Sequence, residues 1–215
     1  TQYSDTAVFP TTEYSYSISA FDAAGKYSDV SAPVAVITPD IPDVLSVTPI
    51  ADTYVNSGSP NSNYGTSTSL RADASPDLHS YLKFNISNLN QKLISKAQLF
   101  IYATNRSSRG LDIHFVENNS WDEKTITFNN RPVQGSVIAT NGSSNSGVWL
   151  AFDVTSIVNS EGLFSFSVTT PGSSSISMAS RESGANAPYM VLDLYRIQPD
   201  VESPTAPSAL AASVI

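Results

Sequence analysis

The sequence predicts an all-β protein whose centre is a two-sheet, jelly-roll-like β-sandwich. Three observations lead to this prediction: apolar residues alternate with polar ones in short runs, Gly, Pro, Asn and Ser separate the runs, and helical periodicity is nearly absent. Hydrophobic residues make up 40% of the 215-residue chain, which is enough for a packed core. There is no Cys, so this core must hold without disulfides.

Residues 1–39 predict three short strands joined by turns. Tyr14 and Tyr16 alternate with polar residues, and an apolar run at 34–37 follows a turn at 22–25. The segment resembles the C-terminal part of a fibronectin type III domain. A third of such a domain is too short to bury two sheets, so we expect it to be poorly packed unless it docks elsewhere.

Two Pro-rich, acidic segments flank the middle of the chain. Residues 40–47 are predicted to be a linker. Residues 198–215 are predicted to be a linker and the start of a further domain, because Ser203–Leu210 resembles the first strand of a fibronectin type III domain. The whole module between them is therefore expected at 48–197.

This central module contains many short strand candidates, which is typical of a sandwich. We expect strands at 50–55, 67–72, 79–86, 95–104, 111–117, 124–128, 136–139, 148–154, 163–170, 175–181 and 188–196.

Period-2 alternation assigns the faces of these strands. Leu82 and Phe84 point to the predicted core, which leaves Tyr81 and Lys83 on the opposite face. The same pattern places Trp149, Tyr189 and Tyr195 on outer faces. Strand 97–104 is ambiguous because both of its faces are apolar, and Tyr102 lies on one of them.

Aromatic rings beside hydrogen-bonding groups are what a sugar site requires, because a pyranose has an apolar C–H face and a rim of hydroxyls. We therefore select Tyr81, Lys83, Tyr102 and Trp149 as candidate ligand-binding residues. The alternative is that such rings pack under loops or form cross-strand pairs.

The arginines are a second group of candidates. Arg71, Arg131 and Arg181 carry planar forks that recognise carboxylates and would suit an acidic polysaccharide. The alternative is structural pairing with Asp122, Glu123 or backbone carbonyls. Trp121 is expected to fill space beneath the turn that contains Arg131.

Oxygen ligands on the first and last strands of the module are candidates for a structural calcium ion. Asp52 and Asp193 share the predicted outer face, and Glu182 ends the penultimate strand. The alternative is that Asp52 or Glu182 pairs with Arg181 or Arg71. The two His residues are too few and too widely spaced for a zinc site.

Charge and motif content disfavour several function classes. The net charge is −8 and there is no run of Lys and Arg, so nucleic-acid binding and membrane-surface binding are not expected. No apolar stretch reaches the roughly 20 residues that span a bilayer. A nucleophile elbow is absent, and Asp122 and Glu123 are sequence neighbours that would point to opposite faces of a strand, so they form a poor catalytic pair.

Several phrases in fixed order carry a resemblance to a family. They are Ala51–Val55, Asn63–Gly65, Ser69–Arg71, Tyr81–Phe84, Trp121–Glu123, Asn129–Pro132, Phe152–Thr155 and Ala179–Glu182. Together they resemble a DNRLRE domain, the group that includes carbohydrate-binding module family 96. The position after Tyr81-Leu82 holds Lys83 where the family leads us to expect Arg, so the charge is kept and the fork is lost.

The resemblance implies a jelly-roll-like module of secreted, multidomain bacterial or archaeal proteins, beside lyases, hydrolases or fibronectin type III spacers. Some members bind acidic polysaccharides such as alginate. We therefore expect a non-catalytic polysaccharide-binding module, extracellular or at the cell surface, with neighbouring domains as partners. The alternatives are a structural or adhesive spacer and, third, a polysaccharide lyase or hydrolase.

Overall fold

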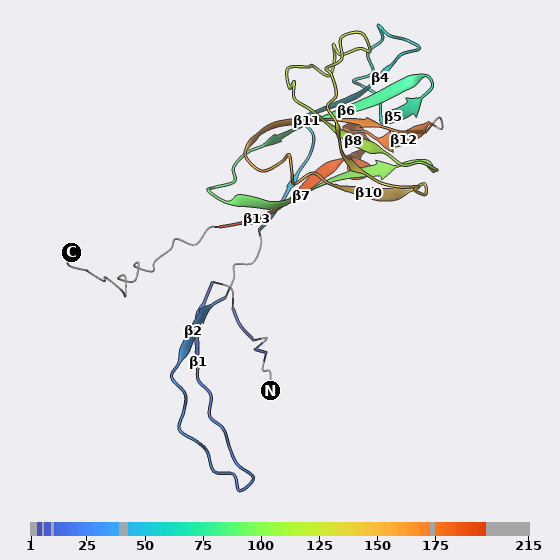
Figure 1. Ribbon diagram of the computed structural model, residues 1–215. Coiled ribbons are helices and arrows are strands. Elements are labelled where there is room, and N and C mark those ends of the chain that lie inside the picture. Colours follow the sequence, from blue (N-terminus) through green and yellow to red (C-terminus); the bar gives the residue numbers. More distant parts are fainter. Residues whose placement is uncertain (1–3, 6, 10, 39–42, 173–174, 197–215) are drawn as a thin grey trace, which may run out of the picture.

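The computed structural model describes residues 4–5, 7–9, 11–38, 43–172 and 175–196 (Figure 1). Near the N-terminus, β1 (Glu13–Tyr16) and β2 (Val34–Ile37) form a separate antiparallel pair. All four residues of β2 are exposed, as expected for a piece without a second sheet. Its assignment to a fibronectin type III domain stays a prediction, and residues 198–215 lie outside the described part.

The remaining strands form the sandwich. They are β3 (Asp43–Val47), β4 (Ala51–Asn56), β5 (Ser69–Ala74), β6 (Asp77–Ile86), β7 (Leu93–Ala103), β8 (Asp112–Val116), β9 (Val137–Thr140), β10 (Val148–Asp153), β11 (Gly162–Thr169), β12 (Ile176–Ala179) and β13 (Tyr189–Tyr195). A short 3₁₀ segment, η1 (Arg181–Asn186), joins the last two strands.

The strands lie in two layers, so the prediction of an all-β sandwich is confirmed. One layer contains β3, β13, β7, β12 and β10, and the other contains β4, β6, β11, β8 and β9. Strand β5 joins the layers because it pairs with β12 through Ser69–Ala72 and with β6 through Asp73–Ala74. Figure 1 shows β7, β10 and β13 below β4 and β6.

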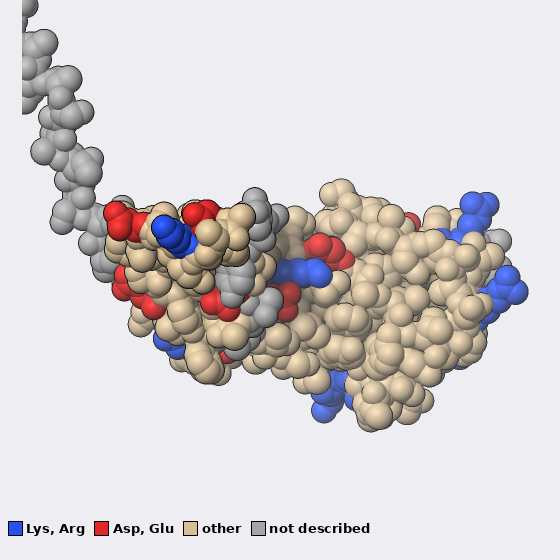
Figure 2. All heavy atoms as spheres, turned by 90° about the horizontal axis from the view of Figure 1, so that it is seen from below, with Lys and Arg blue, Asp and Glu red and all other residues tan. Residues whose placement is uncertain are grey.

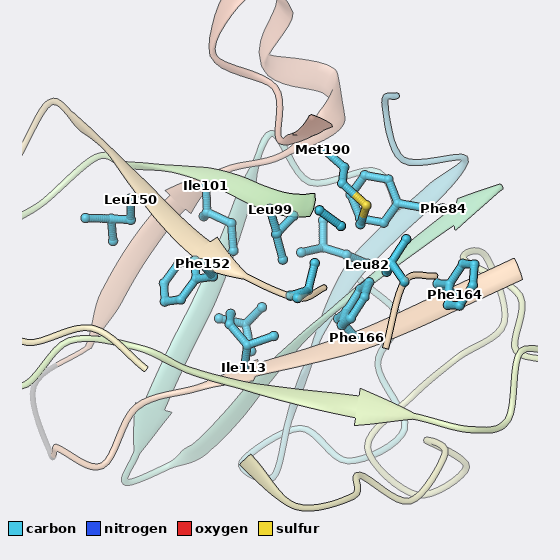
Figure 3. Packing of buried hydrophobic residues seen from close by; sticks show 14 of the residues in the cluster. Leu82, Phe84, Leu99, Ile101, Ile113, Leu150, Phe152, Phe164, Phe166 and Met190 are labelled. Carbon is cyan, nitrogen blue, oxygen red and sulfur yellow. The ribbon is translucent and has the colours of Figure 1, made fainter. Parts of the chain in front are cut away.

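The main core fills the space between the layers (Figure 3). Leu82 and Phe84 of β6 meet Phe166 of β11, with the Phe84 and Phe166 rings edge to face at 6.2 Å. Leu99 and Ile101 enter from the opposite layer and are fully buried. Alternation therefore identified the inward side of β6 and β11 correctly, and the structure decides the ambiguous β7, whose Leu99 and Ile101 point inward.

A second, smaller apolar cluster lies on the outer face of the β6 layer. The alternation pattern predicts that Tyr81 is exposed on this face. In the structure Tyr81 is fully buried there against Trp121, with the two ring centroids 6.0 Å apart. The loop 117–136 covers this face. Both faces of β6 are therefore buried, and the expectation that one of them meets solvent is wrong.

Two predicted boundaries need correction. Residues 43–47 were expected in a linker, but they form β3, which pairs with β13 at the edge of the sandwich. Residues 124–128 were expected to be a strand, but they form turns, because the carbonyl of Asp122 accepts hydrogen bonds from the amides of Thr125 and Ile126.

The 63–65 phrase holds this turn in place. The Asn63 side chain donates to the carbonyls of Glu123 (2.8 Å) and Ile126 (2.7 Å). Gly65 lies so close that an added Cβ would be 2.1 Å from the Glu123 carbonyl oxygen. Only a residue without a side chain fits here.

Replacing Gly65 by Ala is expected to lower the free energy of unfolding by about 1–3 kcal/mol or more, because the contact is with rigid backbone. The matched control is Gly142→Ala, where an added Cβ meets nothing within 4 Å. Urea unfolding of both variants measures the difference. Equal stability of the two variants would contradict this packing of loop 117–136.

Candidate functional site

The open outer face of the sandwich lies on β10, β7 and β13. The register pairs Trp149 with Tyr102 across β10 and β7, and Phe100 with Tyr189 across β7 and β13. Side chains at directly opposed positions share a face of the sheet. The inward neighbours of these residues belong to the core, so all four rings point outward from the same three strands.

The four rings form one continuous group. Phe100 and Tyr189 are stacked in parallel with centroids 4.8 Å apart. Trp149 meets Tyr189 edge to face at 5.0 Å and Tyr102 at 5.1 Å. Trp149 is 37% exposed, and the other three residues are half-buried. We call Phe100, Tyr102, Trp149 and Tyr189 the aromatic strip.

Polar groups follow the aromatic strip along the same strands. Gln98 lies opposite Asp153 of β10, and Lys96 lies opposite Asp193 of β13. The Asp153 carboxylate accepts hydrogen bonds from the Thr155 side chain and from the Thr155 amide, the latter at 3.0 Å. These two hydrogen bonds lower the pKa of Asp153 below its ordinary value. The face thus grades from apolar rings to amide and charged groups, and Figure 2 shows this side of the sandwich as mostly uncharged.

Two of the predicted sugar-contacting residues do not lie on this face. The Tyr81 hydroxyl donates to the Pro132 carbonyl at 3.0 Å, and burial raises the pKa of Tyr81 to about 12. The Lys83 ammonium donates to the carbonyl of Trp121 and lies 4.3 Å from its ring centroid. Trp121 itself is buried and donates to Ser165 at 3.0 Å. These residues hold loop 117–136 and are covered by it, so an exposed role for Tyr81 and Lys83 is not what the fold provides.

Two predicted arginines make local contacts. The Arg131 guanidinium stacks on Phe128 at 3.5 Å and donates to the Phe128 carbonyl. It also lines a cavity of about 330 Å³ together with His79 and Gln134. Arg71 lies over the ring of Tyr54 at 5.7 Å.

The third arginine is the centre of an ionic cluster. Arg181 donates to both oxygens of Glu123, from Nε at 2.9 Å and from Nη2 at 3.0 Å, and its Nε also lies 3.1 Å from Glu182. Its backbone amide donates to Asp52 at 2.8 Å, and the Asp52 amide donates to Glu123 at 2.8 Å. We call Asp52, Glu123, Arg181 and Glu182 the ionic cluster.

This cluster matches the predicted oxygen site only in part. Asp52 and Glu182 do come together, and their oxygens and that of Glu123 lie within 4.8 Å of one another. Asp193 is on β13 in the other layer, beside Lys96, and its inclusion in the site is corrected. The Arg181 guanidinium already supplies positive charge here. Calcium binding at Asp52, Glu123 and Glu182 stays a prediction.

The sequence pointed to only some of the residues that the fold brings together. From the sequence, Glu123 is a candidate partner for an arginine and half of a poor catalytic pair, but not a candidate metal ligand. Phe100 lies on the ambiguous strand, and Tyr189 has outward parity without being among the selected residues. The signal for Phe100 and Tyr189 was present, because each has the outward parity of a strand whose other parity is fully apolar.

The model of carbohydrate-binding module family 96 matches residues 44–194. A gellan lyase from Bacillus sp. is 25% identical over 181 residues, which cover 77% of this chain and 7% of that protein. A solved structure titled "Structure of infectious bursal disease virus Gx strain" is 15% identical over 87% of this chain and 43% of that one, with a TM-score of 0.25. At that score the structural likeness carries no weight. The described residues include no helix long and apolar enough to cross a membrane.

Burial of Asp52 has a consequence for stability that can be measured. Burial, more than any other cause, raises the pKa of Asp52 from 3.8 to about 7. The folded protein therefore favours the protonated acid, so this stability is fully present below pH 4 and is lost as pH rises towards 7. Asp52→Asn keeps a neutral acceptor at every pH. It should leave stability at pH 4 nearly unchanged and raise it at pH 8, by at most about 4 kcal/mol.

The measurement is the difference in unfolding free energy between Asp52→Asn and the wild type across this pH range. Taking the difference removes the titration of all other groups. A difference that stays flat from pH 4 to pH 8 would contradict the raised pKa.

Proposed function

This chain belongs to carbohydrate-binding module family 96, and we propose from this premise that it is a non-catalytic module that binds polysaccharide through the aromatic strip. Membership follows from the family match over residues 44–194. The observation that carries the proposal is the contiguous group of outward-facing rings on β10, β7 and β13.

The aromatic strip fits the chemistry of a sugar ring. The C–H face of a pyranose packs on an aromatic ring, and its hydroxyls need donors and acceptors at the edge of the contact. Trp149 offers the most exposed ring, and Gln98 and Asp153 lie next along the same face. Because the rings pack on one another, little side-chain freedom is lost when a sugar docks.

We propose that the parent protein is a larger, secreted one. A module that holds its neighbours on a polymer raises their effective substrate concentration without adding chemistry. The gellan lyase that the chain resembles supports this arrangement, because the chain spans only 7% of that protein. We propose that this parent is a carbohydrate-active or cell-surface protein.

The prediction that the polymer is acidic now depends on Arg131. Of the three selected arginines, Arg181 is saturated by Glu123 and Glu182, and Arg71 lies over Tyr54. Arg131 borders a cavity of about 330 Å³, a volume within the range of small-ligand sites. Recognition of an anionic sugar at this cavity is separate from the aromatic strip, because the cavity lies on the other layer.

Trp149→Ala is expected to weaken polysaccharide binding by at least about tenfold, because a central exposed ring contributes on the order of 1.4 kcal/mol or more. The matched control is Tyr27→Ala, which removes a ring that is 74% exposed in the segment before the sandwich. Affinity gel electrophoresis against a panel of soluble polysaccharides measures both. Thermal unfolding of each variant confirms that the fold is kept.

The spacer alternative predicts a different outcome. A module that serves only as an adhesive or structural spacer would show no retention by any polysaccharide, and Trp149→Ala would behave as the wild type. Equal loss of binding in both variants would also reject the aromatic strip as the site.

A further inference from the structure

We propose that the aromatic strip selects an uncharged polysaccharide and discriminates against polymers that carry a carboxylate on each sugar. This inference rests on the proposed function and names the substrate class of the same site. It depends on the arrangement of charges around the four rings.

The cation within this face is already balanced. Lys96 lies opposite Asp193 on β13, and it is close enough to Asp153 of β10 to help lower the pKa of that carboxyl. The lysine therefore stands between two carboxylates, and the group as a whole is negative. An incoming carboxylate would meet this excess of negative charge rather than a free cation.

Asp153 remains ionised at neutral pH. The largest cause of its lowered pKa is the side-chain hydrogen bond with Thr155, followed by the hydrogen bond from the Thr155 amide. Because ionised Asp153 can only accept hydrogen bonds, it suits sugar hydroxyls and repels carboxylates. The neighbouring Gln98 amide can donate and accept, which again suits hydroxyls.

The arginines of the described residues all lie outside β10, β7 and β13. Arg181 is bound in the ionic cluster, Arg131 stacks on Phe128 in the other layer, and Arg71 lies over Tyr54. Arg106 and Arg109 lie between β7 and β8, and Arg196 follows β13. No bidentate fork therefore belongs to the β10, β7 and β13 positions that carry the strip.

The size of the face increases the discrimination. From Lys96 to Tyr102 the strand rises by roughly 20 Å, so several sugar units of a polymer would lie along it. Each carboxylate would lose hydration beside apolar rings without gaining a paired cation, which is unfavourable. An uncharged polymer has only hydroxyls to satisfy, and Gln98 and Asp153 are placed for them.

The direct test compares polymers that differ only in charge. Polygalacturonate is paired with its methyl ester, and alginate with its carboxyl-reduced form, and neutral glucans and mannans complete the panel. The quantity measured is the affinity that Trp149→Ala removes. We expect the uncharged member of a pair to bind at least tenfold more tightly, with little change between ~0.01 M and ~1 M salt.

Two variants test the cause. Asp153→Asn keeps an oxygen for the Thr155 amide and removes one negative charge, so it should raise the Trp149-dependent affinity for the charged polymer about two- to fivefold. Lys96→Gln should lower that affinity by a similar factor. Lys96→Gln should leave the affinity for the uncharged partner within its error, while Asp153→Asn, which replaces a charged acceptor of sugar hydroxyls by an amide, should not raise it.

The outcomes separate the two proposals. If Trp149→Ala weakens binding of the charged polymer and that polymer binds as tightly as its uncharged partner, the selectivity is wrong while polysaccharide binding by the strip stands. If Trp149→Ala changes binding to nothing in the panel, the proposed function fails and the selectivity falls with it.

Discussion

The pairing of Glu123 with Arg181 decides which face of the sandwich stays open. Glu123 comes from loop 117–136, Arg181 from η1, and Asp52 from β4, and their hydrogen bonds tie these three segments together. Asp52 and Glu123 are buried, so removal of a partner would leave a buried polar group without its hydrogen bonds, which is costly. These hydrogen bonds hold loop 117–136 over β4 and β6. The outer face of that layer is therefore buried in the second apolar cluster. The other layer keeps its outer face free.

This asymmetry explains where alternation in the sequence was sufficient and where it failed. For β10 and β13, one parity was apolar and the other mixed, and the structure places them inward and outward accordingly. For β6, the same pattern led to Tyr81 and Lys83 as surface residues. Nothing in a period-2 pattern tells whether a loop covers the second face, since a buried Lys that donates to a carbonyl and stacks on Trp121 looks the same in sequence as an exposed one.

The pairing across distant segments was similarly out of reach. Pairing of Asp52 or Glu182 with Arg181 or Arg71 was the alternative to a calcium site, and both acids do contact Arg181. It could not place Asp193, because the layer to which a strand belongs depends on crossovers such as that of β5, which joins both layers. The turn at 124–128 was missed for a related reason: its hydrogen bonds come from Asp122 and from Asn63, which is far away in the chain.

The division between the two layers also separates the phrases that carry the family resemblance from the face that we propose as the ligand site. The phrases that carry the resemblance include Ala51–Val55, Asn63–Gly65, Trp121–Glu123 and Ala179–Glu182, and these supply the ionic cluster and the loop that it holds. The aromatic strip lies outside all of them, at Phe100, Tyr102, Trp149 and Tyr189. In this chain the phrases that carry the resemblance therefore build the scaffold, while the aromatic strip lies outside them on the three open strands. It follows that the identity of the polymer has to be argued from the rings and charges of this face.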